Sequence, residues 1–245
     1  MPRHESQTSL TRLATIGHAA RAAIALVLTL LLSLLILVNT GSFDARAQPS
    51  MEAATSPFHL KTEPITGGNA LDQWRRVQAE IVEERKILER CRTTGPCPAP
   101  ARLLLNLIKQ GDQAKGRARI GRINRAVNFA IYPMSDLQQW GVPDRWSSPF
   151  ETLRVGRGDC EDYAIVKYVA LLEAGIPADA VKLVIVRNEQ PNEDHAAVAA
   201  RLDDQWLILD ERRLAMVRDV DLAQATPKLE LDEHGARRFV PQREN

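Results

Sequence analysis

The chain has 245 residues, of which 44% are hydrophobic and 26% are charged, and its formal net charge is +1. This near-neutral balance excludes the broad electrostatic attraction by which proteins hold nucleic acids, so we expect no nucleic-acid partner. The length suits one domain with a substantial hydrophobic core.

Residues 1–47 form a predicted export signal. Basic residues precede the uncharged apolar run 22–38, and the small-residue site Ala45-Arg46-Ala47 follows it. This order is typical of a bacterial secretory signal peptide. The run is slightly long for such a peptide and slightly short for a spanning helix, so an uncleaved membrane anchor is the alternative. Either reading predicts a periplasmic domain, with 28 basic and 29 acidic residues after the signal.

Residues 48–68 are rich in Ser, Thr, Pro and Gly, so we predict a flexible linker ahead of a domain over residues 69–245. Apolar residues at helical spacing then predict helices over residues 69–91, 101–110 and 117–131. The third helix carries a basic stripe. That stripe is either a docking face for an acidic partner or an ordinary solvated surface.

Residues 132–158 show no convincing period and contain aromatic residues and prolines, which predicts a long loop. Such a loop forms a cleft wall or is simply pinned by buried anchors. A central helix is predicted from Asp159 or Cys160 to Gly175. The period then changes to that of β-strands, which we predict over residues 181–186, 195–202, 205–209, 228–231 and 237–240. Helices followed by antiparallel strands predict an α+β domain.

The three cysteines point to different roles. Cys91 and Cys97 are separated by a turn-forming spacer, and exported proteins tolerate disulfides, so a local bridge is predicted, with two free thiols as the alternative. Cys160 remains as a single thiol at the start of a helix, where the partial positive charge favours thiolate over thiol. A small unreactive residue at this position is the alternative.

Three residues suited to thiol catalysis stand at the ends of predicted elements. Cys160 begins the central helix, His195 begins a strand and Asp210 ends the next strand. In an antiparallel hairpin, the start of one strand lies beside the end of its partner. His195 can therefore take the thiol proton while Asp210 fixes the tautomer of the ring. A zinc site built from the same residues lacks a further ligand.

The motifs that contain these residues are similar to those of a known family. The stretches Gly158-Asp159-Cys160-Glu161-Asp162-Tyr163-Ala164, Asp194-His195-Ala196-Ala197-Val198 and Leu207-Ile208-Leu209-Asp210 resemble the bacterial transglutaminase-like cysteine peptidases. That family includes the periplasmic LapG-type adhesin proteases. The resemblance spans residues 71–240, and the chain departs from it at Glu211-Arg212-Arg213, where the family often has Asn directly after the triad acid.

The resemblance implies a papain-like, transglutaminase-type fold. Its implied roles are Cys160 as nucleophile, His195 as base and Asp210 as the orienting group. It also implies cleavage of a cell-surface protein such as a biofilm adhesin, and control by an inner-membrane receptor that responds to cyclic di-GMP.

Three acids flank the predicted nucleophile, namely Asp159, Glu161 and Asp162. Their charge should raise the pKa of the Cys160 thiol and oppose the effect of the helix dipole, and a bound cation would remove that conflict. Calcium is the hard ion that several carboxylates suit, and the family resemblance implies calcium at these three positions. The alternative needs no metal, because Asp159 can cap the helix while the other two acids complement its dipole.

The predicted function is a calcium-dependent periplasmic cysteine endopeptidase that acts on a protein substrate. Acyl transfer to an amine is an alternative, because the triad does not decide which nucleophile attacks the thioester. A non-catalytic binding module of the same fold is the other alternative.

Overall fold

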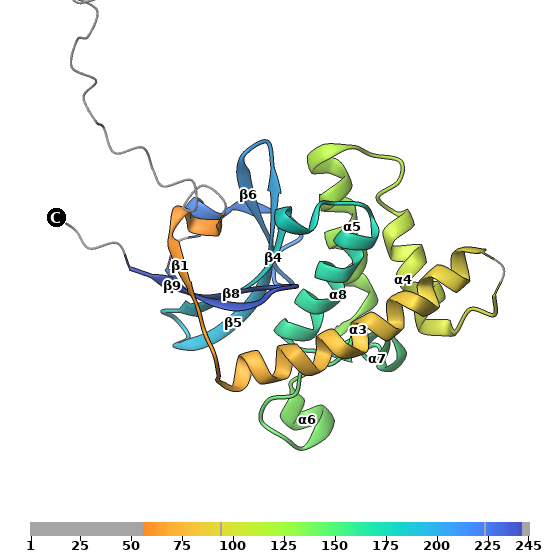
Figure 1. Cartoon of the computed structure of the whole chain (residues 1–245), viewed down its shortest axis with the longest axis horizontal. Coiled ribbons are helices and arrows are strands. Elements are labelled where there is room, and N and C mark those ends of the chain that lie inside the picture. Colours follow the sequence, from red (N-terminus) through yellow and green to blue (C-terminus); the bar gives the residue numbers. More distant parts are fainter. Residues whose placement is uncertain (1–55, 94, 223, 242–245) are drawn as a thin grey trace, which may run out of the picture. The chain divides into compact units, whose positions relative to one another are not determined.

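The computed structural model describes residues 56–93, 95–222 and 224–241 (Figure 1). The predicted export signal of residues 1–47 lies outside the described residues. Among the helices that are described, none combines the length and the apolar character needed to cross a bilayer.

Within this part of the chain the largest element is a seven-stranded sheet in which every pairing is antiparallel. Its strands follow the order β1 (Lys61–Pro64), β9 (Gly235–Val240), β8 (Ala225–Asp232), β4 (Val181–Asn188), β5 (Glu193–Leu202), β6 (Gln205–Leu209) and β7 (Val217–Arg218). All five predicted strands lie within these elements.

The helices gather on one side of this sheet (Figure 1). They are α3 (Asn69–Thr93), α4 (Ala99–Lys109), α5 (Gly116–Ala130), α6 (Asp136–Trp140), α7 (Pro149–Val155) and α8 (Cys160–Glu173). The 3₁₀ turns are η1 (Pro57–His59), η2 (Ala178–Ala180) and η3 (Asp219–Asp221), and Phe58 of η1 packs on the other face of the sheet. The predicted α+β class is confirmed, and so are the three N-terminal helices and the central helix.

Helix α8 forms the centre of the core. It packs on β4 and β5 on one side and on α4, α5 and α7 on the other. Residues 161–171 are therefore buried around the whole helix. Because α8 is enclosed by these neighbours, its first residue has a fixed position at the end of the inner strands β4 and β5.

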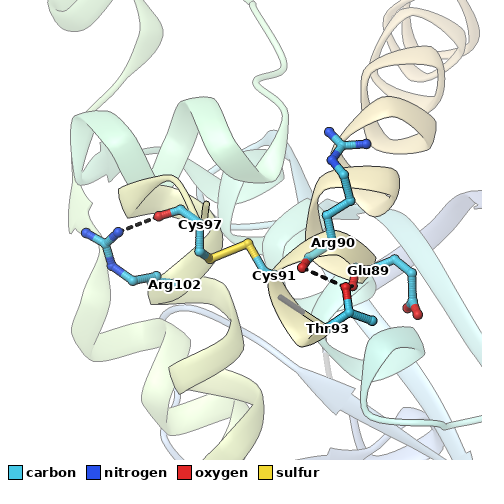
Figure 2. Close-up of a disulfide and its surroundings, with 6 residues drawn as sticks. All are labelled: Glu89, Arg90, Cys91, Thr93, Cys97 and Arg102. Carbon is cyan, nitrogen blue, oxygen red and sulfur yellow. Dashed lines mark hydrogen bonds between the residues drawn. A yellow bond between two sulfur atoms is a disulfide. The ribbon is translucent and has the colours of Figure 1, made fainter. Parts of the chain in front are cut away.

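Helix α3 is tied to the sheet and to α4. The indole of Trp74 donates a hydrogen bond of 2.8 Å to the carbonyl of Asp232 and meets Tyr168 edge-to-face, with ring centroids 5.4 Å apart. The predicted disulfide between Cys91 and Cys97 is confirmed, and it joins the end of α3 to the start of α4 (Figure 2). The guanidinium of Arg102 donates to the carbonyl of Cys97 beside it.

The linker predicted over residues 48–68 is wrong at residues 61–64, which form the edge strand β1. Thr62 pairs with Phe239 of β9, is buried, and donates from its hydroxyl to Glu230 at 3.1 Å. A four-residue strand is too short to show alternation, and its terminal proline is tolerated because the strand lies at the sheet edge. The domain therefore begins before Asn69.

The long loop predicted over residues 132–158 is also wrong in part, since it contains α6 and α7. Helices of five and seven residues are too short to display a helical period. The segment is closed by a parallel pairing of β2 (Tyr132–Pro133) with β3 (Arg157–Gly158). This pairing holds the start of α6 beside the start of α8.

The hairpin formed by β5 and β6 has the predicted tight turn. Asp203 and Asp204 both have positive φ, at 50° and 60°, as a two-residue turn of the primed type requires. The register pairs Val198 with Leu209, so its continuation sets Asp210 opposite Ala197. His195 lies two residues from Ala197 and thus faces the same side of the sheet.

The basic stripe of α5 is partly engaged within the fold. Arg119 pairs with Asp112 at 3.8 Å, and Arg117 donates to the carbonyl of Met216 at 3.1 Å. Docking of an acidic partner on this stripe stays a prediction.

Candidate active site

Cys160 is the first residue of α8 and lines a cleft of about 990 Å³ together with His195. In the described part of the chain it is the free cysteine. Its Sγ accepts a hydrogen bond from the backbone N–H of Ala196 at 3.4 Å, which brings the thiol next to the start of β5. The start of α8 and the start of β5 thus meet at Sγ of Cys160, as predicted.

The thiol proton is held by an acid. Cys160 Sγ lies 3.1 Å from Oε2 of Glu161, to which it donates. Burial raises the pKa of the Cys160 thiol, and the negative charge of Glu161 raises that pKa further. The predicted effect of a flanking acid on the thiol is therefore present, and it adds to the larger effect of burial.

His195 and Asp210 are joined by a buried hydrogen bond. Nε2 of His195 lies 3.0 Å from Oδ1 of Asp210, which also accepts from the backbone N–H of Arg212 at 2.9 Å. Burial favours the neutral acid, but the hydrogen bonds from His195, Glu211 and the backbone of Arg212, together with the charge of His195, outweigh it and hold the pKa of Asp210 below its usual range. The other ring nitrogen of His195, Nδ1, is buried and has no hydrogen-bond partner among the described residues.

The structure thus brings the three predicted residues into one site, where one of the two side-chain contacts expected of a triad is formed. The contact of His195 with Asp210 is formed, whereas the thiol of Cys160 is bound to Glu161 and not to the ring. The ring nitrogen left without a partner is the one that can accept a thiol proton.

A group of acids surrounds the start of α8. Oxygen atoms of Asp136, Asp159 and Glu161 all lie within 4.8 Å of one another. The side chain of Asp159 makes no capping hydrogen bond to α8, so the capping role considered from the sequence is not observed. Instead Asp159 Oδ2 accepts from the backbone N–H of Asp136 at 3.3 Å, and its Oδ1 is buried with no hydrogen-bond partner among the residues that the structure describes.

Asp162 occupies a separate position behind this group. Its Oδ1 accepts from the backbone N–H of Ser147 at 2.8 Å, while Oδ2 is buried and has no hydrogen-bond partner within the described part of the chain. A Cβ atom at Gly158 would lie 2.5 Å from that same Oδ2, so only glycine leaves room for the carboxylate. The set of three acids predicted from the sequence is therefore incomplete, because Asp136 joins Asp159 and Glu161 while Asp162 lies to one side.

The crowding and burial of these acids disfavour their charged forms. Burial, reinforced by the charge of Asp159, raises the pKa of Glu161 to about 9. Burial raises the pKa of Asp162 to about 8 and that of Asp136 to about 6, and neighbouring acids add to both shifts. Crowded carboxylates with unpartnered buried oxygens are chemically suited to hold a hard divalent cation.

Sequence reasoning missed Asp136. It lies 23 residues before Asp159, within the segment that had no readable period. Its only local signal is the preceding Ser135, which accepts from Gln138 N at 3.4 Å as the N-cap of α6. Such a cap indicates a helix start and says nothing about a partner in α8.

A comparison with protein families identifies part of the chain. Residues 105–225 match the model of a family described as bacterial transglutaminase-like cysteine proteinases. That range contains Cys160, His195 and Asp210. A comparison with curated proteins finds no match to the chain.

Solved structures of LapG from Legionella pneumophila share the fold. One has a TM-score of 0.52 at 22% sequence identity and covers 63% of this chain and 87% of that chain. A calcium-bound LapG structure covers 66% and 90%, and an EGTA-treated one covers 66% and 88%, both with the same score and identity. At this level of identity the likeness concerns the fold, and it confirms the predicted transglutaminase-like α+β architecture.

Proposed function

Because residues 105–225 belong to the bacterial transglutaminase-like cysteine proteinase family and the chain is thus a cysteine peptidase, we propose that Cys160, His195 and Asp210 form its catalytic triad. The observation that supports this most directly is the state of His195. Its Nε2 is bound to Asp210, and its Nδ1 is buried and unpartnered in the cleft that Cys160 lines. A histidine held in this way has one tautomer, with Nδ1 available as a base.

In the proposed reaction, Nδ1 of His195 takes the proton of the Cys160 thiol. The thiolate attacks the scissile carbonyl carbon, and the negative charge moves to the carbonyl oxygen. The unsatisfied backbone N–H groups at the start of α8 stabilise that oxyanion. The imidazolium then protonates the leaving amine, the C–N bond breaks, and water attacks the thioester to release the acid and restore the thiol. Asp210 stays ionised throughout and stabilises the imidazolium.

We also propose that the enzyme depends on calcium held by Asp136, Asp159 and Glu161, with Asp162 next to them. Support comes from the proximity of the oxygens, the unpartnered buried oxygens of Asp159 and Asp162, and the calcium-bound state of LapG. A bound cation supplies positive charge that lowers the pKa of the neighbouring thiol. Glu161 then no longer competes with His195 for the thiol proton.

We propose that this peptidase acts in the periplasm on a cell-surface or secreted protein such as a biofilm adhesin. An inner-membrane receptor is the expected regulatory partner. These proposals rest on the export signal predicted over residues 1–47 and on the family resemblance of the motifs. The open cleft of about 990 Å³ is large enough for an extended peptide segment.

Comparison of surface and secreted proteins between wild-type cells and cells with Cys160→Ala tests this function. A protein that is shortened in the wild type and stays full-length with Cys160→Ala is the expected result. Cleavage of that protein by the purified enzyme should then require calcium and stop in EGTA. Stable attachment of a labelled amine to a glutamine donor, without any chain cleavage, would instead establish the acyl-transfer alternative.

A further inference from the structure

A second carboxylate contacts the same nitrogen of His195 as Asp210 does. Oε2 of Glu211 lies 3.4 Å from His195 Nε2, and the Glu211 side chain is only 12% exposed. This oxygen has no hydrogen-bond partner among the described residues, while Oε1 pairs with Nε of Arg212 at 3.2 Å. One oxygen of Glu211 is therefore anchored, and the other is directed at the histidine.

The backbone around Glu211 is held in place from α5. The amide of Asn128 donates to the carbonyl of Asp210 at 3.0 Å and to the carbonyl of Glu211 at 3.3 Å. Arg212 adds a second restraint, since its backbone N–H binds Asp210 and its guanidinium binds Glu193 at 2.9 Å. The closeness of Glu211 to the ring thus follows from an ordered loop and not from a free side chain.

A buried lysine supplies positive charge to this pair of acids. Lys167 is 1% exposed, its Nζ has no hydrogen-bond partner among the described residues, and it lies 5.9 Å from the centre of the Tyr163 ring. It follows Cys160 by two helical turns on the same face of α8. Burial lowers the pKa of Lys167 to about 7, and the charges of Glu211 and Asp210 oppose that shift. An unpaired buried lysine is costly unless nearby anions compensate it.

We propose that Glu211 is a positioning residue whose carboxylate lies beside that of Asp210 at Nε2 of His195, and that Lys167 balances the charge of the two carboxylates. The inference rests on the proposed triad and adds a fourth and a fifth group to it. A second carboxylate beside Nε2 favours the tautomer that carries its proton there and stabilises the imidazolium, which leaves Nδ1 as the base. This role belongs to the residue at which the chain departs from the family motif.

The cluster of His195, Asp210 and Glu211 also has metal-ligand spacing, since its ligand atoms lie within 4.8 Å of one another. The ammonium group of Lys167 argues against a cation there, because it already provides the positive charge that the acids need. At the start of α8 the charge of Arg145 acts on Asp136, but Asp159 Oδ1 and Asp162 Oδ2 are buried without a hydrogen-bond partner among the described residues, so the cation is assigned to that cluster.

The test follows the ring of His195 directly by NMR of protein labelled with ¹³C at histidine Cε1, in excess calcium. His195→Gln assigns the resonance. Loss of an anion beside the imidazolium should lower the pKa of His195 by about one pH unit in Glu211→Gln, whereas loss of the ammonium should raise it in Lys167→Met. Glu83→Gln is the matched control, since it removes an exposed carboxylate of α3 that pairs with Lys86. Arg212→Gln keeps the Glu211 carboxylate and isolates any effect that passes through the arginine.

Opposite shifts in Glu211→Gln and Lys167→Met, with Glu83→Gln unchanged, support the proposal. An unchanged His195 titration in Glu211→Gln, or equal shifts in Glu83→Gln, overturns it. If Glu211→Gln does not fold, Glu211→Asp serves instead and should give a smaller shift in the same direction.

Alkylation of Cys160 by iodoacetamide tests the triad separately from the role of Glu211. If His195→Ala reacts as fast as the wild type the triad itself fails, whereas a slow His195→Ala with a normal Glu211→Gln titration removes Glu211 alone.

Discussion

The backbone N–H of Asp136 donates to Oδ2 of Asp159 at 3.3 Å, although 23 residues separate the two. The parallel pairing of β2 with β3 creates this contact, because it returns the chain to the start of α8 immediately before Asp159. The segment between the two acids therefore brings a third carboxylate to Asp159 and Glu161 beside Cys160. Asp136 is accordingly the residue with which the calcium proposal can be tested most selectively, because it lies far from the nucleophile in sequence.

Asp136→Asn should weaken calcium binding by about tenfold or more, because the number of charged ligands tunes calcium affinity. Isothermal titration with calcium measures this, and magnesium should not substitute. The control is Asp72→Asn, which removes an exposed acid from α3. Equal calcium affinity in Asp136→Asn and wild type would remove Asp136 from the site.

The calcium-free protein should lose stability as pH rises from about 4 to about 9. The folded-state pKa values of Glu161 and Asp162 are raised to about 9 and about 8, whereas both acids have ordinary values near 4 when unfolded. Over that range the folded state binds more protons than the unfolded state, so the free energy of unfolding falls with pH. Urea denaturation at several pH values in EGTA measures the slope. Calcium should flatten it, and a slope that is the same with and without calcium would contradict the proposed site.

Several parts of the fold could be predicted because they have long, regular patterns. The 25 residues of α3 and the strands of the β5–β6 hairpin display their periods clearly, and the pairing of His195 with Asp210 follows from the turn at Asp203. Strand β1 and helices α6 and α7 are shorter than the window in which a period can be detected. These three elements form because contacts with other parts of the fold stabilise them.

The site was predictable only where its chemistry is local in the sequence. Cys160 and its flanking acids stand in one motif, so both the nucleophile and the charge conflict could be foreseen. Asp136 joins through a contact between distant segments, and the role of Glu211 depends on a side-chain direction that no pattern encodes. In the sequence, Lys167 is an ordinary polar residue of the central helix. Its burial, which only the structure shows, indicates that it interacts with the acids Asp210 and Glu211.

Gly158→Ala should destabilise the protein by about 1–3 kcal/mol, the typical cost of overpacking. The added Cβ would lie 2.5 Å from Oδ2 and 2.6 Å from Cβ of Asp162, so the carboxylate cannot yield by simple rotation. Urea denaturation gives the change, and Gly67→Ala is the control, since a Cβ there meets nothing within 4 Å. Equal stability of the two variants would show that Asp162 is not tightly held.

Removal of the Cys91–Cys97 disulfide should lower the free energy of unfolding by about 2 kcal/mol, as expected for a short loop in the unfolded chain. The paired variant Cys91→Ser with Cys97→Ser tests this in urea. The rate of Cys160 alkylation under native conditions should not change, because the bridge joins α3 to α4 and makes no contact with the thiol. A slower alkylation would mean that the bridge also supports the site.

Asp210→Asn should slow both alkylation of Cys160 at neutral pH and substrate cleavage, with cleavage falling by about 100-fold or more. Asp210 is held ionised in the fold, and its depressed pKa contributes stability above about pH 4 that is lost as pH falls through the folded-state pKa. The variant should therefore be less stable than the wild type at pH 7 and less sensitive to acid. Asp203→Asn is the matched control in the same hairpin, where the turn has positive φ and accepts asparagine.

Because Glu211 also contacts Nε2 of His195, Asp210→Asn should keep more activity than His195→Ala. Adding Glu211→Gln to Asp210→Asn should remove the activity that remains. Equal activity of Asp210→Asn and the double variant would mean that Asp210 orients the ring alone.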